Sequence, residues 1–216
     1  MSVTADDLFR IKNAEIINPA KLIKKVFKGV SIDSRKCSKS DLFFAIKGEK
    51  FDGHDFVLEI LKRGCRCVVV QRNWFNKNKK QLAALKNKSI IVVKDTVEAI
   101  GKLANIYRSH FVIPVIAVAG SNGKTSTKDF AAHVLSKKYK VLKTEGNLNN
   151  QLGVPLTIFR LNKKHDMAVV EVGTNHFGEV TYLCEILEPQ FGIITNIGKE
   201  HLEFLKSISG AAKAEG

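Results

Sequence analysis

Hydrophobic and polar positions alternate in a regular order over the second half of the chain. Short apolar runs predict strands, and stretches with apolar residues three or four positions apart predict helices. In chain order the expected elements are a strand over 115–119, a helix over 125–137, a strand over 140–143, a helix over 154–159, a strand over 167–172, a helix over 179–187 and a strand over 191–196. This alternation predicts a parallel sheet with helices on both faces and with ligands at the carboxyl ends of its strands.

The first half of the chain follows a similar but less regular pattern. Apolar runs at 30–32, 42–46, 67–70 and 90–93 predict strands, and residues 56–63 predict a helix. Asp95 and Thr96 begin a longer helix that continues to about His110, and Pro114 follows it. We therefore expect an α/β chain of two domains, a small N-terminal domain over 1–112 and a second domain over 113–216.

The net charge of +14 is concentrated in the first of these domains. Residues 1–113 hold 23 Lys and Arg against 11 Asp and Glu, whereas residues 114–216 hold 12 against 10. The surplus predicts an anionic partner or substrate, and a lysine-rich surface that only interacts with water is the alternative. Because no basic motif is interleaved with aromatic residues, we expect no nucleic-acid partner.

The cysteines and the apolar runs point to a protein of the cytoplasm. Cys37, Cys65, Cys67 and Cys184 lack metal-ligand spacing, and Cys65 and Cys67 are interpreted as packing residues of a strand. The sequence has neither the pattern of a signal peptide nor an apolar run of transmembrane length. We expect reduced thiols, no membrane insertion and a monomer.

The residues after the strand at 115–119 predict a phosphate-binding loop, which reads Gly120-Ser121-Asn122-Gly123-Lys124-Thr125-Ser126. The glycines let backbone N–H groups approach phosphate oxygens, Lys124 reaches the β- and γ-phosphates, and the Thr125 hydroxyl can bind Mg²⁺. The helix that follows directs its positive end at the same anion. The match is to the shorter form of the motif, since Val118 stands where the full form has a glycine. An ordinary strand–helix turn is the alternative.

Candidate metal ligands follow the next two strands. Glu171 ends the apolar run at 167–172, where a buried carboxylate needs a cation or hydrogen bonds. Beside a phosphate loop we expect Mg²⁺, and pairing with a lysine or with backbone amides is the alternative. His201 is a candidate second ligand or an ordinary surface or packed histidine.

Three asparagines, Asn147, Asn149 and Asn150, lie between the strand at 140–143 and the helix at 154–159. Asparagine favours turns, so a structural loop is one interpretation. The other is a binding loop, because amides both donate and accept hydrogen bonds and suit a substrate with hydroxyls, phosphates and peptide groups.

Together these motifs resemble the Mur ligase family, whose members extend the peptide of bacterial cell-wall precursors. The resemblance covers nearly the whole chain. Besides the phosphate loop it is carried by 144–150 with 153–157, by 171–179, by 195–198 with 201–203, and upstream by Asp33-Ser34-Arg35, 41–45, Lys47-Gly48 and Asp52-Gly53-His54. Residues 147–150 and 175–179 resemble the branch that adds D-alanyl-D-alanine to UDP-N-acetylmuramoyl-tripeptide.

The resemblance implies an ATP-dependent amide ligase that uses Mg²⁺. ATP would phosphorylate the terminal carboxylate of the UDP-bound tripeptide, and the amine of D-alanyl-D-alanine would attack the acyl phosphate. The first domain would bind the uridine nucleotide and the second would be the ATPase domain. The implied catalytic residues are Lys124, Thr125, Glu171 and His201, and the implied substrate contacts are Ser34, Arg35, Asn147, Asn149, Asn150, Asn175 and His176. For the segment Asp33-Ser34-Arg35, the alternative is that Asp33 and Arg35 pair with each other.

Family members are longer, so we expect an N-terminal fragment with a truncated second domain that is inactive alone. The family also has a carbamylated lysine that helps to hold a second Mg²⁺. Glu215 stands at that place here, with Lys213 two residues earlier. We hypothesise that Glu215 supplies the carboxylate directly, and a carbamylated Lys213 is the alternative. Another ligase of the superfamily and a non-catalytic nucleotide-binding module are the alternative functions.

Overall fold

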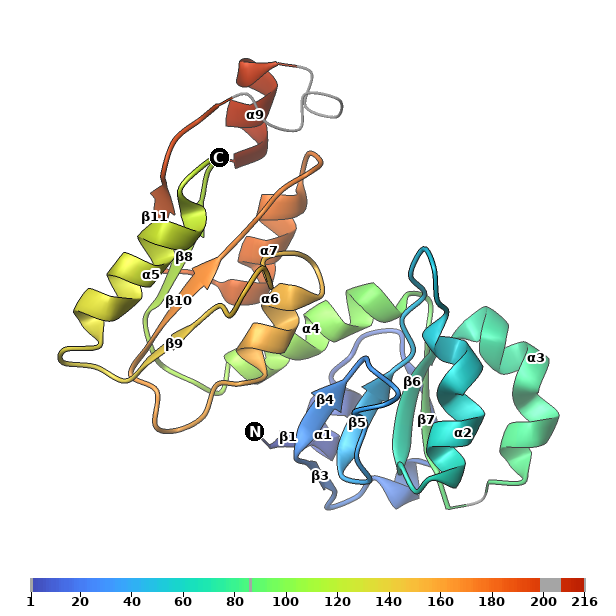
Figure 1. The fold of residues 1–216 in the computed structure, drawn as a ribbon. Coiled ribbons are helices and arrows are strands. Elements are labelled where there is room, and N and C mark those ends of the chain that lie inside the picture. Colours follow the sequence, from blue (N-terminus) through green and yellow to red (C-terminus); the bar gives the residue numbers. More distant parts are fainter. Residues whose placement is uncertain (1, 86, 199–206, 216) are drawn as a thin grey trace. The chain divides into compact units, whose positions relative to one another are not determined.

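The computed structural model describes residues 2–85, 87–198 and 207–215, which fall into two compact units, Met1–Leu103 and Ala104–Gly216 (Figure 1). Each unit is built on its own mostly parallel sheet, which confirms the predicted α/β class. The two units divide inside helix α4 (Thr96–Arg108). The domain boundary at 112–114 stays a prediction.

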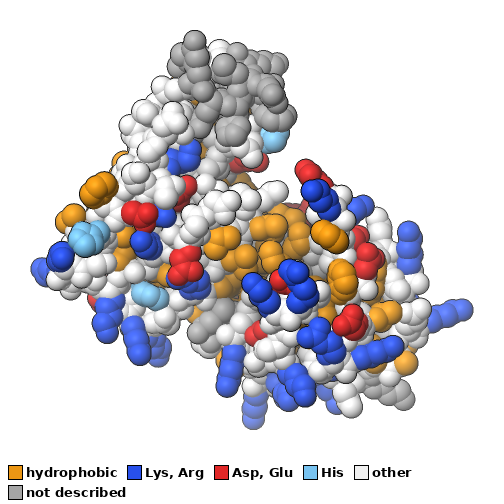
Figure 2. All heavy atoms as spheres, viewed as in Figure 1, with side chains coloured by type: hydrophobic (Ala, Val, Ile, Leu, Met, Phe, Trp, Pro, Cys, Tyr) orange, Lys and Arg blue, Asp and Glu red, His pale blue; other side chains and the backbone are white. Residues whose placement is uncertain are grey.

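A five-stranded sheet in the order β2-β7-β6-β5-β4 forms the first unit. Its strands are parallel except β2, which pairs antiparallel with β7. Helices α2 and α3 cover one face through a cluster that includes Phe43, Val68 and Ile90. Figure 2 shows Lys and Arg side chains over the visible face of this unit. Besides α4, its elements are β1 (Val3–Thr4), α1 (Ala5–Phe9), β2 (Glu15–Ile17), η1 (Pro19–Lys21), β3 (Val26–Phe27), β4 (Gly29–Ser31), β5 (Asp41–Phe44), η2 (Gly53–Phe56), α2 (Val57–Lys62), β6 (Cys67–Gln71), α3 (Arg72–Ala83) and β7 (Ser89–Val93).

The first 28 residues contain elements that the sequence analysis did not predict. β1 and β3 form a two-stranded antiparallel ribbon, and α1 begins at a capping box between Thr4 and Asp7. β1, β2 and β3 have only two or three residues and do not lie in the regular alternation of strands and helices that helped to predict strands elsewhere.

A parallel four-stranded sheet in the order β11-β8-β10-β9 forms the second unit. Helix α5 packs on one face, where Ala132 meets Val118 and Val169. Helices α6 and α7 contact β10 and β8. The elements are β8 (Val115–Ala119), α5 (Lys124–Leu135), β9 (Val141–Lys143), α6 (Gly153–Ile158), β10 (Met167–Glu171), α7 (Glu179–Leu187), β11 (Phe191–Ile194) and α9 (Ile208–Glu215).

The register of this sheet places three strand ends together. Glu171 of β10 lies beside Val118 of β8, and Ile194 of β11 lies beside Ala119. The loops that leave these strands therefore begin side by side, as expected for ligand sites of parallel sheets. No described helix combines the length and the apolar character needed to cross a membrane.

Candidate nucleotide and metal site

The phosphate loop, residues 120–125, connects β8 to α5 through two glycines with positive φ. Gly120 has φ +115°, and a Cβ there would lie 2.4 Å from Thr195 Oγ1 and 2.9 Å from the Asn196 carbonyl oxygen. Gly123 has φ +79° and forms the N-cap of α5, with nothing within 4 Å of a Cβ. Gly120 thus has no room for a side chain, whereas Gly123 needs only its backbone conformation.

The residues after β11 hold the phosphate loop by hydrogen bonds. Asn196 accepts from the Ser121 N–H at its carbonyl oxygen (3.0 Å) and from the Asn122 N–H at Oδ1 (2.8 Å). Thr195 Oγ1 donates to the Asn122 carbonyl oxygen (2.6 Å), and the Gly198 N–H donates to Ser121 Oγ (2.8 Å). The N–H groups of Ser121 and Asn122 are therefore engaged. Among the described residues, Thr125 and Ser126 at the start of α5 offer backbone N–H groups to a phosphate, since helix geometry gives these N–H groups no intrahelical partner.

Lys124 and Thr125 begin α5 on the open side of the loop. Lys124 Nζ donates to the carbonyl oxygens of Gly120 and Ser121. The exposed Thr125 hydroxyl has no hydrogen-bond partner among the described residues. Both side chains lie within a turn of the helix N-terminus, as a phosphate and Mg²⁺ site requires.

Glu171 is buried at the end of β10 and is only partly satisfied. It is 3 % exposed, and its Oε1 accepts a hydrogen bond from Asn149 Nδ2 at 2.9 Å. Its Oε2 accepts no hydrogen bond among the described residues. Lys128 Nζ lies 3.8 Å from this oxygen. The sequence predicted either a metal ion or a lysine as the partner of Glu171. Oε2 lies near a lysine and is also the oxygen that a metal ion could bind.

Lys128 is a buried cation that the sequence analysis missed. It lies one helical turn after Lys124 and is 2 % exposed. Its Nζ donates to the Thr144 carbonyl oxygen at 3.1 Å, while the Thr144 hydroxyl accepts from the Glu171 N–H at 2.9 Å. Lys128, Thr144 and Glu171 therefore form one network between α5, β10 and the end of β9. In the sequence Lys128 is marked only by its four-residue spacing from Lys124, which does not indicate Glu171 as a partner.

The residues present fit Mg²⁺ in part. The Glu171 oxygen and the Thr125 hydroxyl, which lack hydrogen bonds within the described part of the chain, are suitable oxygen ligands, and Mg²⁺ takes its other ligands from water and substrate phosphates. The described residues contain no group of three or more His, Cys, Asp and Glu that could hold a metal. His201 lies outside the described residues. Glu215 ends α9, and the roles proposed for it and for the exposed Lys213 stay predictions.

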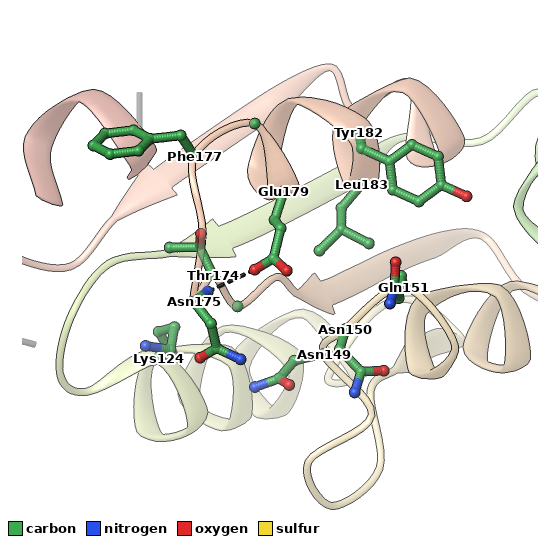
Figure 3. Close-up of a pocket in the computed structure, with 12 residues that line it drawn as sticks. Lys124, Asn149, Asn150, Gln151, Thr174, Asn175, Phe177, Glu179, Tyr182 and Leu183 are labelled. Carbon is green, nitrogen blue, oxygen red and sulfur yellow. Dashed lines mark hydrogen bonds between the residues drawn. The ribbon is translucent and has the colours of Figure 1, made fainter. Parts of the chain in front are cut away.

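A cavity of about 480 Å³ opens beside the phosphate loop (Figure 3). Four predicted site residues line it: Lys124, Asn149, Asn150 and Asn175. Residues that the sequence analysis had not assigned complete the wall, namely Gln151, Gly173, Thr174, Phe177, Gly178, Glu179, Tyr182 and Leu183. Asn147 and His176 are not among the lining residues. Their expected substrate contacts stay predictions.

The asparagine loop, residues 147–150, is also stabilised by hydrogen bonds of its own side chains. Asn150 Oδ1 accepts from the N–H groups of Leu152 and Gly153 (3.1 and 2.9 Å), and Asn149 turns its amide to Glu171. The structural interpretation therefore applies to Asn149 and Asn150. Both residues also line the cavity, and the binding interpretation stays a prediction.

Glu179 shapes the opposite wall of the cavity. Its Oε2 accepts hydrogen bonds from the N–H groups of Asn175 (2.6 Å) and His176 (3.1 Å). Burial opposes ionisation of Glu179, but these backbone bonds and the His176 side chain outweigh it and lower its pKa. A carboxylate at the start of α7 thus fixes the segment before it.

In the first unit, Ser34 and Arg35 lie in the loop after β4. Arg35 pairs with Asp33 through two side-chain bonds of 2.9 Å, which is the alternative left open by the sequence. The hydrogen bond from Arg35 is the main cause that lowers the pKa of Asp33 to about 2. Ser34 is half-buried, and its carbonyl oxygen accepts from Arg63 Nη1 at 3.1 Å.

His54 of the same unit is a structural residue. It is 2 % exposed, its Nδ1 lies 2.6 Å from Asp52 Oδ1, and its Nε2 accepts from the Gln71 N–H at 3.0 Å. Both ring nitrogens are therefore engaged, and the ring ties the Asp52 turn to the end of β6.

Comparison with known proteins identifies two family models in the chain. Residues 118–216 match a model described as Mur ligase middle domain, and residues 26–108 match one described as Mur ligase family, catalytic domain. The chain is 37 % identical to UDP-N-acetylmuramoyl-tripeptide--D-alanyl-D-alanine ligase of Bacillus subtilis (strain 168), over 98 % of this chain and 45 % of that protein. It spans about half the length of the curated relatives it matches.

Solved structures give the same relationship. The crystal structure of MurF from Acinetobacter baumannii matches with a TM-score of 0.88 at 34 % identity, covering 100 % of this chain and 45 % of that one. MurF ligase from Thermotoga maritima in complex with ADP matches with a TM-score of 0.76 at 32 % identity, covering 86 % and 41 %.

Proposed function

This chain belongs to the Mur ligase family, and we propose that it is part of an ATP-dependent ligase that joins D-alanyl-D-alanine to UDP-N-acetylmuramoyl-tripeptide in peptidoglycan precursor synthesis. The observation that carries the proposal is the phosphate loop, which Thr195 and Asn196 hold beside the buried Glu171. One carboxylate oxygen of Glu171 accepts no hydrogen bond from the residues that the structure describes. Such a site binds a triphosphate with its cation, as ligation through an acyl phosphate requires.

The residues of the second unit have distinct roles in this proposal. The N–H groups at the start of α5 bind phosphate oxygens, and Lys124 exchanges its two carbonyl contacts for the β- and γ-phosphates. Thr125 and Glu171 would hold Mg²⁺, with His201 and Glu215 proposed for a second ion. Bound Mg²⁺ would neutralise charge on the transferred phosphoryl group.

The substrate carboxylate approaches the phosphates through the cavity beside Lys124. Asn150 and Asn175 line this cavity and present amides to the muramoyl-peptide. Asn147 and His176 are proposed as further contacts, and Ser34 and Arg35 as contacts to the uridine nucleotide. No protein nucleophile is needed, because the carboxylate attacks the γ-phosphate and the dipeptide amine then displaces phosphate. The proposal places the protein in the cytoplasm.

The test is a ligase assay on the complete protein to which this chain belongs. Release of phosphate from ATP is expected only when the UDP-linked tripeptide and D-alanyl-D-alanine are both present. Lys124→Ala should lower kcat/KM by at least about 100-fold, because it removes a charge that meets the transferred phosphoryl group. The exposed Lys137→Ala is the matched control and should leave the rate unchanged. Normal turnover by Lys124→Ala, or product formation only with a different amine, would contradict the proposal.

A further inference from the structure

Another cavity, of about 590 Å³, opens in the first unit, and its lining is strongly basic. Among the described residues that line it none is acidic, and six are basic: Lys21, Lys25, Lys28, Lys39, Arg66 and Lys88. We call it the basic cavity. In Figure 2, Lys and Arg side chains gather along the lower edge of this unit. The cavity thus collects part of the positive charge that the sequence concentrates in the first half of the chain.

The basic cavity lies at the amino ends of the parallel strands. Lys28 directly precedes β4, Arg66 directly precedes β6, and Lys88 directly precedes β7. Because β4, β5, β6 and β7 are parallel, their first residues share one edge of the sheet. Ser34 and Arg35, the proposed uridine contacts, follow β4 and so belong to the opposite edge. The basic cavity is therefore separate from that proposed site.

Backbone hydrogen bonds between the strand starts fix the positions of two of these cations. The Lys28 N–H donates to the Ser40 carbonyl oxygen at 3.0 Å, and the Ser89 N–H donates to the Arg66 carbonyl oxygen at 3.0 Å. The sheet itself therefore sets the spacing of Lys28 and Arg66. A ligand held between them needs to order side chains but not backbone, which lowers the entropic cost of binding.

The segment 21–28 supplies another part of the wall and is anchored to the core. Leu22 and Phe27, which line the cavity, are 1 % and 4 % exposed. Just before this segment, Asn18 Nδ2 donates to the Lys88 carbonyl oxygen at 2.9 Å, and Ser89 Oγ donates to the Asn18 carbonyl oxygen at 3.1 Å. Hydrogen bonds thus join the residues before this segment to the start of β7.

The six cations are not neutralised within the described part of the chain, where none of them forms an ion pair with an Asp or Glu. Elsewhere in the unit such pairs form, as between Arg72 and Glu15. Asp41, which begins β5, does not line the cavity, and its Oδ2 accepts a hydrogen bond from the Ser38 N–H at 2.8 Å. The positive charges of the basic cavity therefore repel one another without a compensating carboxylate.

We propose that the basic cavity binds an oligophosphate, a small molecule with two or more linked phosphate groups. Its volume lies within the range of small-molecule sites, roughly 300–1,000 Å³. An oligophosphate brings several negative charges close together and so offsets the repulsion between the cations. The planar fork of Arg66 can bind two oxygens of one phosphate, and the lysines supply point charges to the others. The proposal concerns the first unit alone and does not depend on the proposed ligase activity.

The shape of the site favours a small ligand over a nucleic acid. A duplex is bound by cations spread along several phosphates of its backbone. Here the cations line one cavity together with the apolar Leu22 and Phe27. Binding of a duplex is accordingly an outcome that the test has to exclude.

The test is calorimetry of the complete protein to which this chain belongs, with sodium tripolyphosphate as the probe and EDTA to remove Mg²⁺. Every protein in the series has Lys124→Ala, which weakens binding of the probe at the phosphate loop of the second unit. We expect the probe to bind at least about tenfold more tightly than inorganic phosphate, because linked phosphates contact several cations at once.

The double variant Lys28→Gln, Arg66→Gln should weaken binding of the probe at least about tenfold, because it removes two charge-assisted contacts. The matched control is Lys77→Gln, Lys80→Gln, which removes the same net charge from exposed positions of α3 outside the cavity. This control should leave the affinity within about twofold of its value in the parent protein. Lys28 and Arg66 are exposed and their hydrogen bonds to the neighbouring strands use the backbone, so the variant is expected to fold, and circular dichroism checks this.

Hydrogen–deuterium exchange locates the bound probe and should show protection of residues 19–28 and 64–67. Equal losses of affinity in the two double variants would show that net charge alone attracts the probe and would overturn the proposal. Inorganic phosphate binding as tightly as tripolyphosphate, or protection confined to other segments, would also overturn it. So would a short DNA duplex that binds more tightly than the probe and loses its affinity in Lys28→Gln, Arg66→Gln. The ligase assay described above has no bearing on any of these outcomes.

Discussion

Each unit places a pair of opposite charges near the carboxyl ends of its parallel strands, but the pairs are held in different ways. The side chains of Lys128 and Glu171 are both 3 % exposed, and their charged atoms lie 3.8 Å apart. Arg35 and Asp33 lie closer, at 2.9 Å, but their side chains are 86 % and 27 % exposed. The shorter contact is thus the one that water surrounds.

Burial decides what each pair does for the fold. Two charges removed from water need further partners, and the Thr144 carbonyl oxygen and the Asn149 amide provide them. The exposed pair is screened by water and contributes little to stability. The buried pair of the second unit is therefore held in place by the fold, whereas the Asp33–Arg35 pair can open at little cost.

The largest effect is expected from Lys128→Met, which breaks the buried pair. Glu171 would remain buried without its cation, and the Thr144 carbonyl oxygen would lose its donor. The free energy of unfolding should fall by about 3–5 kcal/mol. Urea unfolding followed by circular dichroism measures it.

Lys143→Met is the control for this prediction. Lys143 pairs with Asp129 at 2.7 Å, but both side chains are 47 % exposed, so the loss should stay below about 1 kcal/mol. Adding Glu171→Gln to Lys128→Met should recover part of the lost stability, since no uncompensated charge remains. Equal losses for Lys128→Met and Lys143→Met would show that burial does not separate the two kinds of pair.

A smaller effect is expected from Gly120→Ala, which tests how firmly the phosphate loop is held. A methyl group at φ +115° would overlap Thr195 Oγ1 and the Asn196 carbonyl oxygen. Strain and displacement together should cost about 3 kcal/mol and weaken ADP binding, as measured by urea unfolding and calorimetry. No residue of the Asp33–Arg35 turn has positive φ, so that turn has no equivalent constraint.

Gly123→Ala is the matched variant. Gly123 also has a positive φ, +79°, but no atom lies within 4 Å of a Cβ placed there. The substitution should therefore lower the free energy of unfolding by only about 1 kcal/mol. If Gly123→Ala proved as costly as Gly120→Ala, the contacts with Thr195 and Asn196 would not be what holds the loop.

The sequence was sufficient to predict those features that depend on neighbouring residues in the chain. The phosphate loop follows from the order strand, glycine, lysine and helix, and Glu171 follows from a charge at the end of an apolar run. The alternation of strands and helices likewise predicted the second sheet and the ends at which its polar residues gather.

What the sequence left out depends on contacts between distant segments. Lys128 looks like any surface lysine of a helix until β10 places Glu171 against the same face. The role of Asn196 arises because β11 pairs with β8 and not with its neighbour in the chain, β10. The inward turn of Asn149 has the same origin, since Glu171 is 22 residues away in the chain. Residue spacing along one element contains no information on such partners.

The smallest effect concerns the exposed pair and is visible only in a titration. The pKa of Asp33 is about 2, mainly because Arg35 donates a side-chain hydrogen bond to the ionised form, and Arg35→Ala should return it toward its usual 3.8. Because the pKa is lowered in the folded state, the small stabilisation is present above about pH 4 and is lost as the pH falls toward 2. Carboxyl chemical shifts of Asp33 from NMR measure the titration, and Arg35→Lys should fall between the two, since it keeps the charge but loses the paired geometry. An Asp33 titration that does not respond to Arg35→Ala would mean that the exposed pair does not form in solution. The buried pair of Lys128 and Glu171 would then be the one ion pair of the two that the folded chain maintains.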